Sequence, residues 1–385
     1  MAFERYIRSG QKRLRCGYTT GTCAALATAG AARLLLTGKT PETLSLMTPK
    51  GWEVTVAPVL CRMAEKGALC AVLKDGGDDA DATSGLEIRV LVEKTDTPGI
   101  AIDGGEGVGR VTKPGLDQPV GSAAINRVPR QMITQQALAV CREAGYEGGL
   151  AVTVSIPGGA EAAKKTFNPH LGVVGGLSIL GTSGIVEPMS EQALVASLEV
   201  ELRQAAALGN RRLILTPGNY GLDYLRSRGW DRGPAPIVKY SNFLGPALDA
   251  AVAEGFEEVL LVGHLGKLVK VAGGVMNTHS RWADCRAELL CAHAALAGAD
   301  RDLCRSLMEA PTTDACLELL ARAGLQEEVM DSLLTAISRH LQRRVGEKCR
   351  IGAVLFSNTF GFLGQTPEAT RLLRLWNYGT SDTNR

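Results

Sequence analysis

Residues 167–190, FNPHLGVVGGLSILGTSGIVEPMS, separate two parts of the chain that have different sequence patterns. Residues 177–180 are a short apolar run bounded by glycines, which predicts a buried strand. The turn Gly181-Thr182-Ser183-Gly184 follows directly, and Pro188, Ser190 and apolar residues at helical spacing then predict a helix. A strand, a glycine-rich turn and a helix N-terminus can together hold a polar or anionic part of a ligand. We therefore predict a cofactor-binding loop in this stretch.

The length of the chain and the change of pattern predict two domains, because 385 residues exceed one ordinary hydrophobic core. Residues 1–166 are expected to form an α+β domain, in which helices pack on a mainly antiparallel sheet. Residues 167–378 are expected to form an α/β, Rossmann-like domain with a mostly parallel sheet and a helical C-terminal part. The polar tail, residues 379–385, is expected to be disordered.

The composition excludes several classes of protein. The chain has 42 basic and 40 acidic residues, whereas nucleic-acid binding depends on an excess of basic residues. The N-terminus lacks the apolar core of a signal peptide, and the one long uncharged segment is too rich in glycine to span a membrane. We therefore expect a cytoplasmic protein. None of the ten cysteines falls in a C-x-x-C pair, and no protein-bound metal is predicted.

Threonines mark the start of a helix near the N-terminus. Residues 16–24, CGYTTGTCA, open an alanine-dense segment that predicts a helix to about Leu36, with Gly38 as its terminator. The threonines of this motif either bind substrate or cap the helix, and the sequence leaves both interpretations open.

An acidic loop interrupts the strands predicted between residues 44 and 92. Four aspartates follow Lys74 within residues 75–81, but their spacing differs from that of a calcium-binding loop. Both a solvated turn and a ligand-facing loop fit this pattern.

In the second domain, short apolar strands at residues 212–216, 237–240, 258–262 and 352–356 indicate a parallel sheet, since helices separate the first three. Ligands bind beyond the carboxyl ends of such strands. Lys267 and Lys270 are three residues apart, so we expect them to point from one helical face towards the same ligand. The loops at these strand ends and one helix later contain Gly218-Asn219-Tyr220, His264 and Asn277-Thr278-His279.

Six motifs in this order are specific together: GYTTGTCAA, KDGGDDADAT, GGEGVGRVTKPGL, SIPGGAEAAKKTFNPHLGVVGGLSILGTSGIVEPMSEQAL, PGNYG and LLVGHLGKLVKVAGGVMNTHS. From about Leu14 to Gly364 the sequence resembles the CbiD family, the cobalt-precorrin-5B C1-methyltransferases of anaerobic cobalamin biosynthesis.

This resemblance implies transfer of a methyl group from S-adenosylmethionine to C-1 of cobalt-precorrin-5B, giving cobalt-precorrin-6A. The cobalt is then carried by the tetrapyrrole substrate. The residues expected to bind the methyl donor are Gly181, Thr182, Ser183, Gly184, Glu187, Gly218, Asn219 and Tyr220. Those expected to bind the macrocycle are Thr19, Thr20, Thr22, Lys74, Asp75, Asp78, Lys267, Lys270, Asn277 and Thr278.

Methyl transfer depends mainly on the alignment of donor and acceptor, so no covalent intermediate is expected. His264 and His279 are the catalytic candidates, because either could bind the cobalt axially or act as a base near neutral pH; we favour a positioning role. Two alternatives are a tetrapyrrole-binding scaffold without catalysis and a hydrolase that uses Thr22 or Cys23. Homo-oligomerisation and transient contact with neighbouring pathway enzymes are left open.

Overall fold

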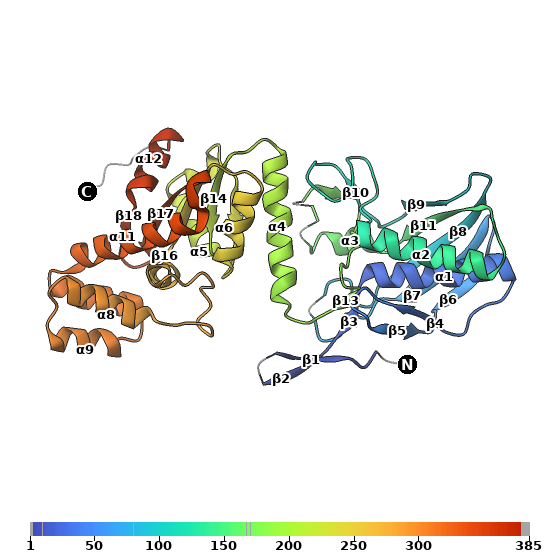
Figure 1. The fold of residues 1–385 in the computed structure, drawn as a ribbon, viewed down its shortest axis with the longest axis horizontal. Coiled ribbons are helices and arrows are strands. Elements are labelled where there is room, and N and C mark those ends of the chain that lie inside the picture. Colours follow the sequence, from blue (N-terminus) through green and yellow to red (C-terminus); the bar gives the residue numbers. More distant parts are fainter. Residues whose placement is uncertain (1–2, 10, 80, 167, 170, 379–385) are drawn as a thin grey trace. The chain divides into compact units, whose positions relative to one another are not determined.

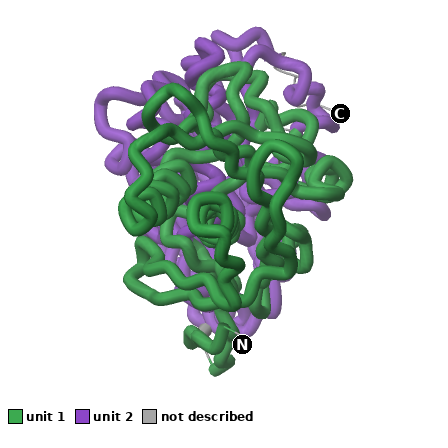
Figure 2. The backbone as a smooth tube through the Cα atoms, turned by 90° about the vertical axis from the view of Figure 1, so that its right-hand side faces the viewer, with its two compact units in different colours: residues 1–191 green, residues 192–385 purple. Residues whose placement is uncertain are grey.

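The computed structural model describes residues 3–9, 11–79, 81–166, 168–169 and 171–378, so the tail predicted to be disordered lies outside the described residues. The chain divides into two compact units, Met1–Glu191 and Gln192–Arg385 (Figure 2). The division falls after Glu191, later than the boundary expected after residue 166. The reason is that β12 (Val173–Val174) and β13 (Ile185–Val186) pair with β10 (Arg110–Val111) and β3 (Gly17–Tyr18) of the first unit.

The first unit is built on a five-stranded sheet of order β6-β7-β8-β11-β9 (Figure 1). Its strands are β6 (Leu60–Ala64), β7 (Gly67–Leu73), β8 (Glu87–Thr95), β9 (Ile100–Gly104) and β11 (Gly149–Ser155). Three of the four pairings are antiparallel, and only β9 and β11 run parallel. The expected mainly antiparallel sheet is therefore confirmed.

Two helices, α1 (Thr20–Thr37) and α2 (Arg127–Glu143), lie side by side in this unit, and α1 packs against β7 and β8. Glycine allows α1 to approach the sheet closely, since a Cβ at Gly30 would lie 2.6 Å from the Sγ of Cys70. Gly38 ends α1 in the left-handed conformation, as predicted.

The remaining elements of this unit are small. They are β1 (Tyr6–Ser9), β2 (Lys12–Arg15), β4 (Leu44–Met47), β5 (Glu53–Val56) and α3 (Gly159–Ala163).

The prediction of a strand at residues 177–180 is wrong. This segment makes only isolated bridges, from Leu177 to Val108 and from Ile179 to Ile125. The helix that follows, α4 (Glu191–Ala207), begins at Glu191, after the β13 strand and a turn, so the glycine-rich turn does not lead into it.

The second unit contains a five-stranded sheet of order β15-β14-β16-β17-β18. Its strands are β14 (Arg212–Thr216), β15 (Ile237–Lys239), β16 (Glu258–His264), β17 (Arg350–Ser357) and β18 (Gly361–Gln365). The first four strands of this order are parallel, and β18 is antiparallel to β17. The four predicted strands are thus found. The chain adds β15 on one side of β14 and β16 on the other, so the order of connection reverses between β14 and β16.

Both faces of this sheet are buried, because alternate residues of each strand enter different hydrophobic clusters. Leu213 and Leu215 of β14 belong to one cluster, and Ile214 belongs to the other. The helices of this unit also include α5 (Asn219–Ser227), α6 (Leu244–Ala253), α7 (Leu265–Leu268), α8 (Arg286–Leu296), α9 (Arg301–Glu309), α10 (Thr313–Arg322), α11 (Gln326–Val345) and α12 (Pro367–Leu375), with short 3-10 turns at Trp230–Arg232, Val269–Gly273 and Gly346–Lys348. Within the described ranges, no helix has the length and apolarity required to cross a membrane.

Candidate functional site

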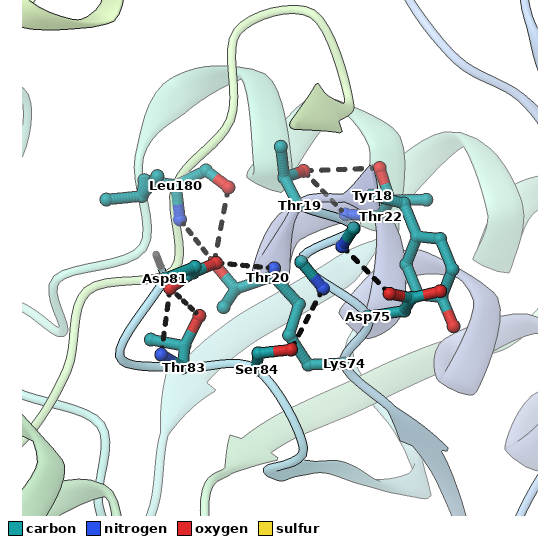
Figure 3. Close-up of polar contacts among 12 residues, drawn as sticks. Tyr18, Thr19, Thr20, Thr22, Lys74, Asp75, Asp81, Thr83, Ser84 and Leu180 are labelled. Carbon is teal, nitrogen blue, oxygen red and sulfur yellow. Dashed lines mark hydrogen bonds and ion pairs between the residues drawn. The ribbon is translucent and has the colours of Figure 1, made fainter. Parts of the chain in front are cut away.

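The predicted site residues fall into two groups, one in each unit. The first surrounds the N-terminus of α1 (Figure 3). Thr19 caps the helix, because its Oγ1 accepts a hydrogen bond from the Thr22 amide at 3.2 Å. Thr22 Oγ1 donates to the Gly184 carbonyl at 2.7 Å, and Thr20 Oγ1 accepts from the Leu180 amide at 3.0 Å. All three threonines are buried, and their hydroxyls are already engaged within the protein.

The turn from Gly181 to Gly184 lies against this helix start. The Thr19 amide donates to the Gly184 carbonyl at 3.1 Å, and the Lys50 amide donates to the Ser183 carbonyl at 3.0 Å. Side chains are excluded at both glycines, since a Cβ at Gly181 would overlap Thr19 and one at Gly184 would lie 2.8 Å from the Cβ of Thr48. The turn therefore contacts the start of α1, and not the helix that follows it in the sequence. Its predicted contact with the methyl donor stays a prediction.

Glu187 forms an ion pair with Lys50, and both side chains are partly exposed. The carboxylate of Glu187 is therefore held by a lysine of the same unit. Its predicted contact with the methyl donor stays a prediction.

The aspartate loop is ordered by contacts of its own. The Asp75 carboxylate accepts two hydrogen bonds from the Arg15 guanidinium, at 2.6 and 2.8 Å, and Asp78 accepts from the Arg15 amide at 2.6 Å. Hydrogen bonding to Arg15 lowers the pKa of Asp75. Asp75 and Asp78 thus hold the N-terminal hairpin, and any contact with substrate would be in addition to that role.

Lys74 is a buried cation beside this loop. Its side chain is 1% exposed, and its Nζ lies 2.7 Å from Asp81 Oδ2. Burial raises the pKa of Asp81, but Lys74 and Thr83 outweigh this effect and the pKa is lowered. Within the described residues, Asp81 is the anionic partner of Lys74, a role that the sequence analysis did not assign to it.

The second group lies in the other unit, at the carboxyl ends of the parallel strands. Tyr220 lies in the first turn of α5, which follows β14, and His264 ends β16; their rings are 6.4 Å apart. The His264 ring also packs edge-on against Phe356 of β17 at 5.7 Å. Residues at or just after the carboxyl ends of three neighbouring strands therefore meet at one edge, where the connection order reverses between β14 and β16.

Asp314 of α10 completes this edge, and the sequence analysis did not identify it. Its carboxylate accepts hydrogen bonds from Ser357 Oγ at 2.9 Å and Thr359 Oγ1 at 2.8 Å. Burial lowers the pKa of His264, whereas the charge of Asp314 acts in the opposite direction. In the sequence, the signal for this contact was the polar run Ser357-Asn358-Thr359 directly after a predicted strand, because it contains the two hydroxyl groups that donate to Asp314.

Lys267 and Lys270 do not share one partner. The Nζ of Lys267 binds Asn242 Oδ1 at 2.7 Å, and the buried Nζ of Lys270 binds the Thr278 carbonyl and Ser280 Oγ, each at 3.1 Å. Burial lowers the pKa of both lysines. Each lysine therefore ties down a different loop, because Lys267 lies in α7 whereas Lys270 lies in the following 3-10 turn.

The loop at residues 277–279 is fixed by short-range contacts. Asn277 Oδ1 accepts from the His279 amide at 3.2 Å, and His279 Nδ1 accepts from the Arg281 amide at 3.1 Å. Thr278 is buried, whereas His279 is exposed. Across the described residues, no set of three or more His, Cys, Asp or Glu side chains is arranged to hold a metal ion.

Comparison with known proteins assigns the chain to a family. Residues 7–188 match the model of the CbiD family, and residues 277–367 match that of the CbiD C-terminal domain. The cobalt-precorrin-5B C(1)-methyltransferase of Ruminiclostridium cellulolyticum is 46% identical over 92% of each chain. The protein of the same name from a Thermoanaerobacter species is 46% identical over 90% of this chain and 92% of its own.

A solved structure, that of the cobalamin biosynthesis protein CbiD from Archaeoglobus fulgidus, has 31% sequence identity and a TM-score of 0.39, and the match covers 73% of this chain and 87% of that one. The family models and the curated relatives agree along most of the sequence. The chain belongs to the CbiD family.

Proposed function

We propose that this protein methylates C-1 of cobalt-precorrin-5B, with S-adenosylmethionine as the methyl donor. The observation that carries the proposal is the 46% identity to a protein named cobalt-precorrin-5B C(1)-methyltransferase over 92% of both chains. The product is then cobalt-precorrin-6A, and the cobalt belongs to the substrate. A cytoplasmic location, homo-oligomerisation and contacts with pathway enzymes stay predictions.

The second unit is, in this proposal, a Rossmann-like domain that binds the donor at Gly218, Asn219 and Tyr220. The position fits, because these residues follow β14 at the reversal of strand connection. The amides of Asn219 and Tyr220 have no hydrogen-bond acceptor among the described residues, so they are available to polar atoms of a ligand. The Tyr220 side chain is 67% exposed and offers an aromatic surface for a nucleobase.

A donor-binding role for the turn Gly181–Gly184 has less support. The Ser183 and Gly184 carbonyls already accept hydrogen bonds from Lys50, Thr19 and Thr22. We propose that this turn fixes the N-terminus of α1, while Glu187 is held by Lys50.

The chemistry requires little more than orientation. When bound, the donor supplies an electrophilic methyl group attached to a sulfonium. The protein has to hold the two partners in line and exclude water, which can contribute several kcal/mol, roughly 7–11 in favourable systems. The fixed loops at the sheet edge, held by Lys267, Lys270 and Asp314, are suited to such positioning.

The direct test is turnover of cobalt-precorrin-5B with S-adenosylmethionine that carries a ¹³C-labelled methyl group. We expect one labelled methyl group at C-1 in the product, seen by NMR and mass spectrometry. A scaffold without catalysis would bind the macrocycle but leave it unmethylated.

Donor placement is tested separately by calorimetry with S-adenosylhomocysteine in the absence of macrocycle. Tyr220→Ala should weaken binding about tenfold, equivalent to ~1.4 kcal/mol, whereas Tyr6→Ala, at an exposed tyrosine of the other unit, should leave binding unchanged. Equal affinities of the two variants would contradict the proposed donor site.

A further inference from the structure

His264 has a defined protonation state, which follows from its place at the start of α7. Its Nδ1 accepts a hydrogen bond from the Gly266 amide at 3.0 Å and so caps the helix. A backbone amide can only donate, so Nδ1 must carry a lone pair. The proton of the neutral imidazole is therefore on Nε2.

The Nε2–H group is free to meet a ligand. It has no hydrogen-bond partner among the described residues, and the His264 ring is only half-buried. The ring lies beside Tyr220 of α5 and Phe356 of β17. The unpaired amides of Asn219 and Tyr220 belong to the same strand-end edge. This edge thus presents hydrogen-bond donors after β14, where the two amides lie, and at the end of β16, where the Nε2–H group lies. The order of strand connection reverses between these two strands.

The groups around His264 favour its neutral form at physiological pH. Burial and the Gly266 amide both disfavour protonation of Nδ1. The opposing charge is Asp314 of α10, whose carboxylate already accepts hydrogen bonds from Ser357 and Thr359. Further titratable groups among the described residues are Tyr220 of α5, whose ring contacts His264, Tyr224 of α5, which stacks on Phe356, and Lys267, three residues along in α7.

We infer that His264 acts as an uncharged Nε2–H hydrogen-bond donor to an oxygen atom of the ligand bound at the carboxyl ends of β14 and β16. This inference rests on the proposed methyltransferase function. A base or an axial cobalt ligand would need the Nε2 lone pair. The proton would then have to move to Nδ1, and the hydrogen bond that caps α7 would be lost.

Two substitutions separate these roles. His264→Asn keeps an acceptor close to the Nδ1 position for the Gly266 amide but removes the Nε2–H donor. His264→Gln places an amide N–H₂ close to the Nε2 position. We expect the Asn variant to lose about 10- to 100-fold in kcat/KM and the Gln variant to stay within about tenfold of the wild type.

The ligand that supplies the oxygen is identified by two further measurements on the Asn variant. Weaker binding of S-adenosylhomocysteine, measured by calorimetry without macrocycle, assigns the oxygen to the methyl donor. A raised KM for cobalt-precorrin-5B, with unchanged S-adenosylhomocysteine affinity, assigns it to the macrocycle. If neither quantity changes, His264 does not contact a ligand and the inference is overturned.

The protonation state is measured without any turnover. Long-range ¹H–¹⁵N NMR of the full chain with ¹⁵N-labelled histidine should show the Nε2–H tautomer for the signal that disappears in both His264 variants. An Nδ1–H tautomer, or equal and complete inactivity of both variants with both ligands still bound, would overturn the inference. Absence of methylation by the wild type would contradict the proposed function, while the NMR and S-adenosylhomocysteine results would still decide the role of His264.

Discussion

The threonines at the start of α1 show how one residue can serve as a cap and resemble a binding site. Thr22 is fully buried, and its hydroxyl contacts a carbonyl 162 residues away in sequence. The hydrogen bonds of Thr19 and Thr20 are also internal. The structure therefore shows that Thr19 caps α1, and a contact of these threonines with substrate stays a prediction.

Thr22→Val should lower the free energy of unfolding by about 0.5–1.5 kcal/mol, because the buried Gly184 carbonyl would lose its hydroxyl donor and keep only the Thr19 amide. Thr37→Val in the same helix is the control, since Thr37 is exposed and its partner, the Arg33 carbonyl, can be hydrated. Urea unfolding measures both variants. A stable Thr22→Val protein with a raised KM for the macrocycle would instead indicate a substrate contact.

Asp81→Asn should be more damaging, because it leaves the buried ammonium of Lys74 without its counter-charge. The expected loss is about 3–5 kcal/mol, typical of breaking a buried ion pair from one side. Asp103→Asn provides the matched control, as Asp103 pairs with Arg110 at the surface and should change stability by less than about 1 kcal/mol.

The same pair should contribute to acid sensitivity. The folded-state pKa of Asp81 is lowered, so its contribution to stability is complete above the unfolded pKa of about 3.9 and is lost as the pH falls through the folded value. Urea unfolding at a series of pH values between about 7 and 2.5 should show that the free energy of unfolding falls more steeply for the wild type than for Asp81→Asn. Parallel curves would contradict this assignment.

At the scale of elements, two lysines hold two loops of the strand-end edge. Lys270→Met should cost about 1–3 kcal/mol, because the Thr278 carbonyl and Ser280 hydroxyl lose a buried donor. Lys267→Met should cost less, since Asn242 and the half-buried Lys267 side chain are accessible to water. Hydrogen exchange of residues 277–280 should increase in the first variant only; equal exchange in both would show that Lys270 does not fix this loop.

At the scale of the whole molecule, each unit has hydrophobic clusters of its own. The largest cluster of the first unit ends at Ile185, and those of the second begin at Leu198. We predict that fragments 1–190 and 191–385 each fold independently. Each should unfold in a cooperative thermal transition, measured by circular dichroism, and should show well-dispersed chemical shifts in NMR spectra. A fragment without such a transition would show that its core depends on the other unit.

Elements with local signals can be predicted from the sequence. The α1 helix follows from Thr19, a run of alanines and Gly38, all of which act within a few residues. The strands β14, β15, β16 and β17 follow from short apolar runs between turns, and the family follows from ordered motifs.

The pairing of distant segments depends on contacts that the sequence pattern does not show. Residues 177–180 have the composition of a strand, but their neighbours are the single residues Val108 and Ile125 and the start of α1. The partner of Asp75 is Arg15, and that of Lys270 is the Thr278 carbonyl. Sequence periodicity reports which side of an element is buried, but it does not report what covers that side. For that reason the contact of Gly184 with α1 and the position of Tyr220 beside His264 could not be predicted from periodicity; they follow from the backbone hydrogen bonds and the strand order.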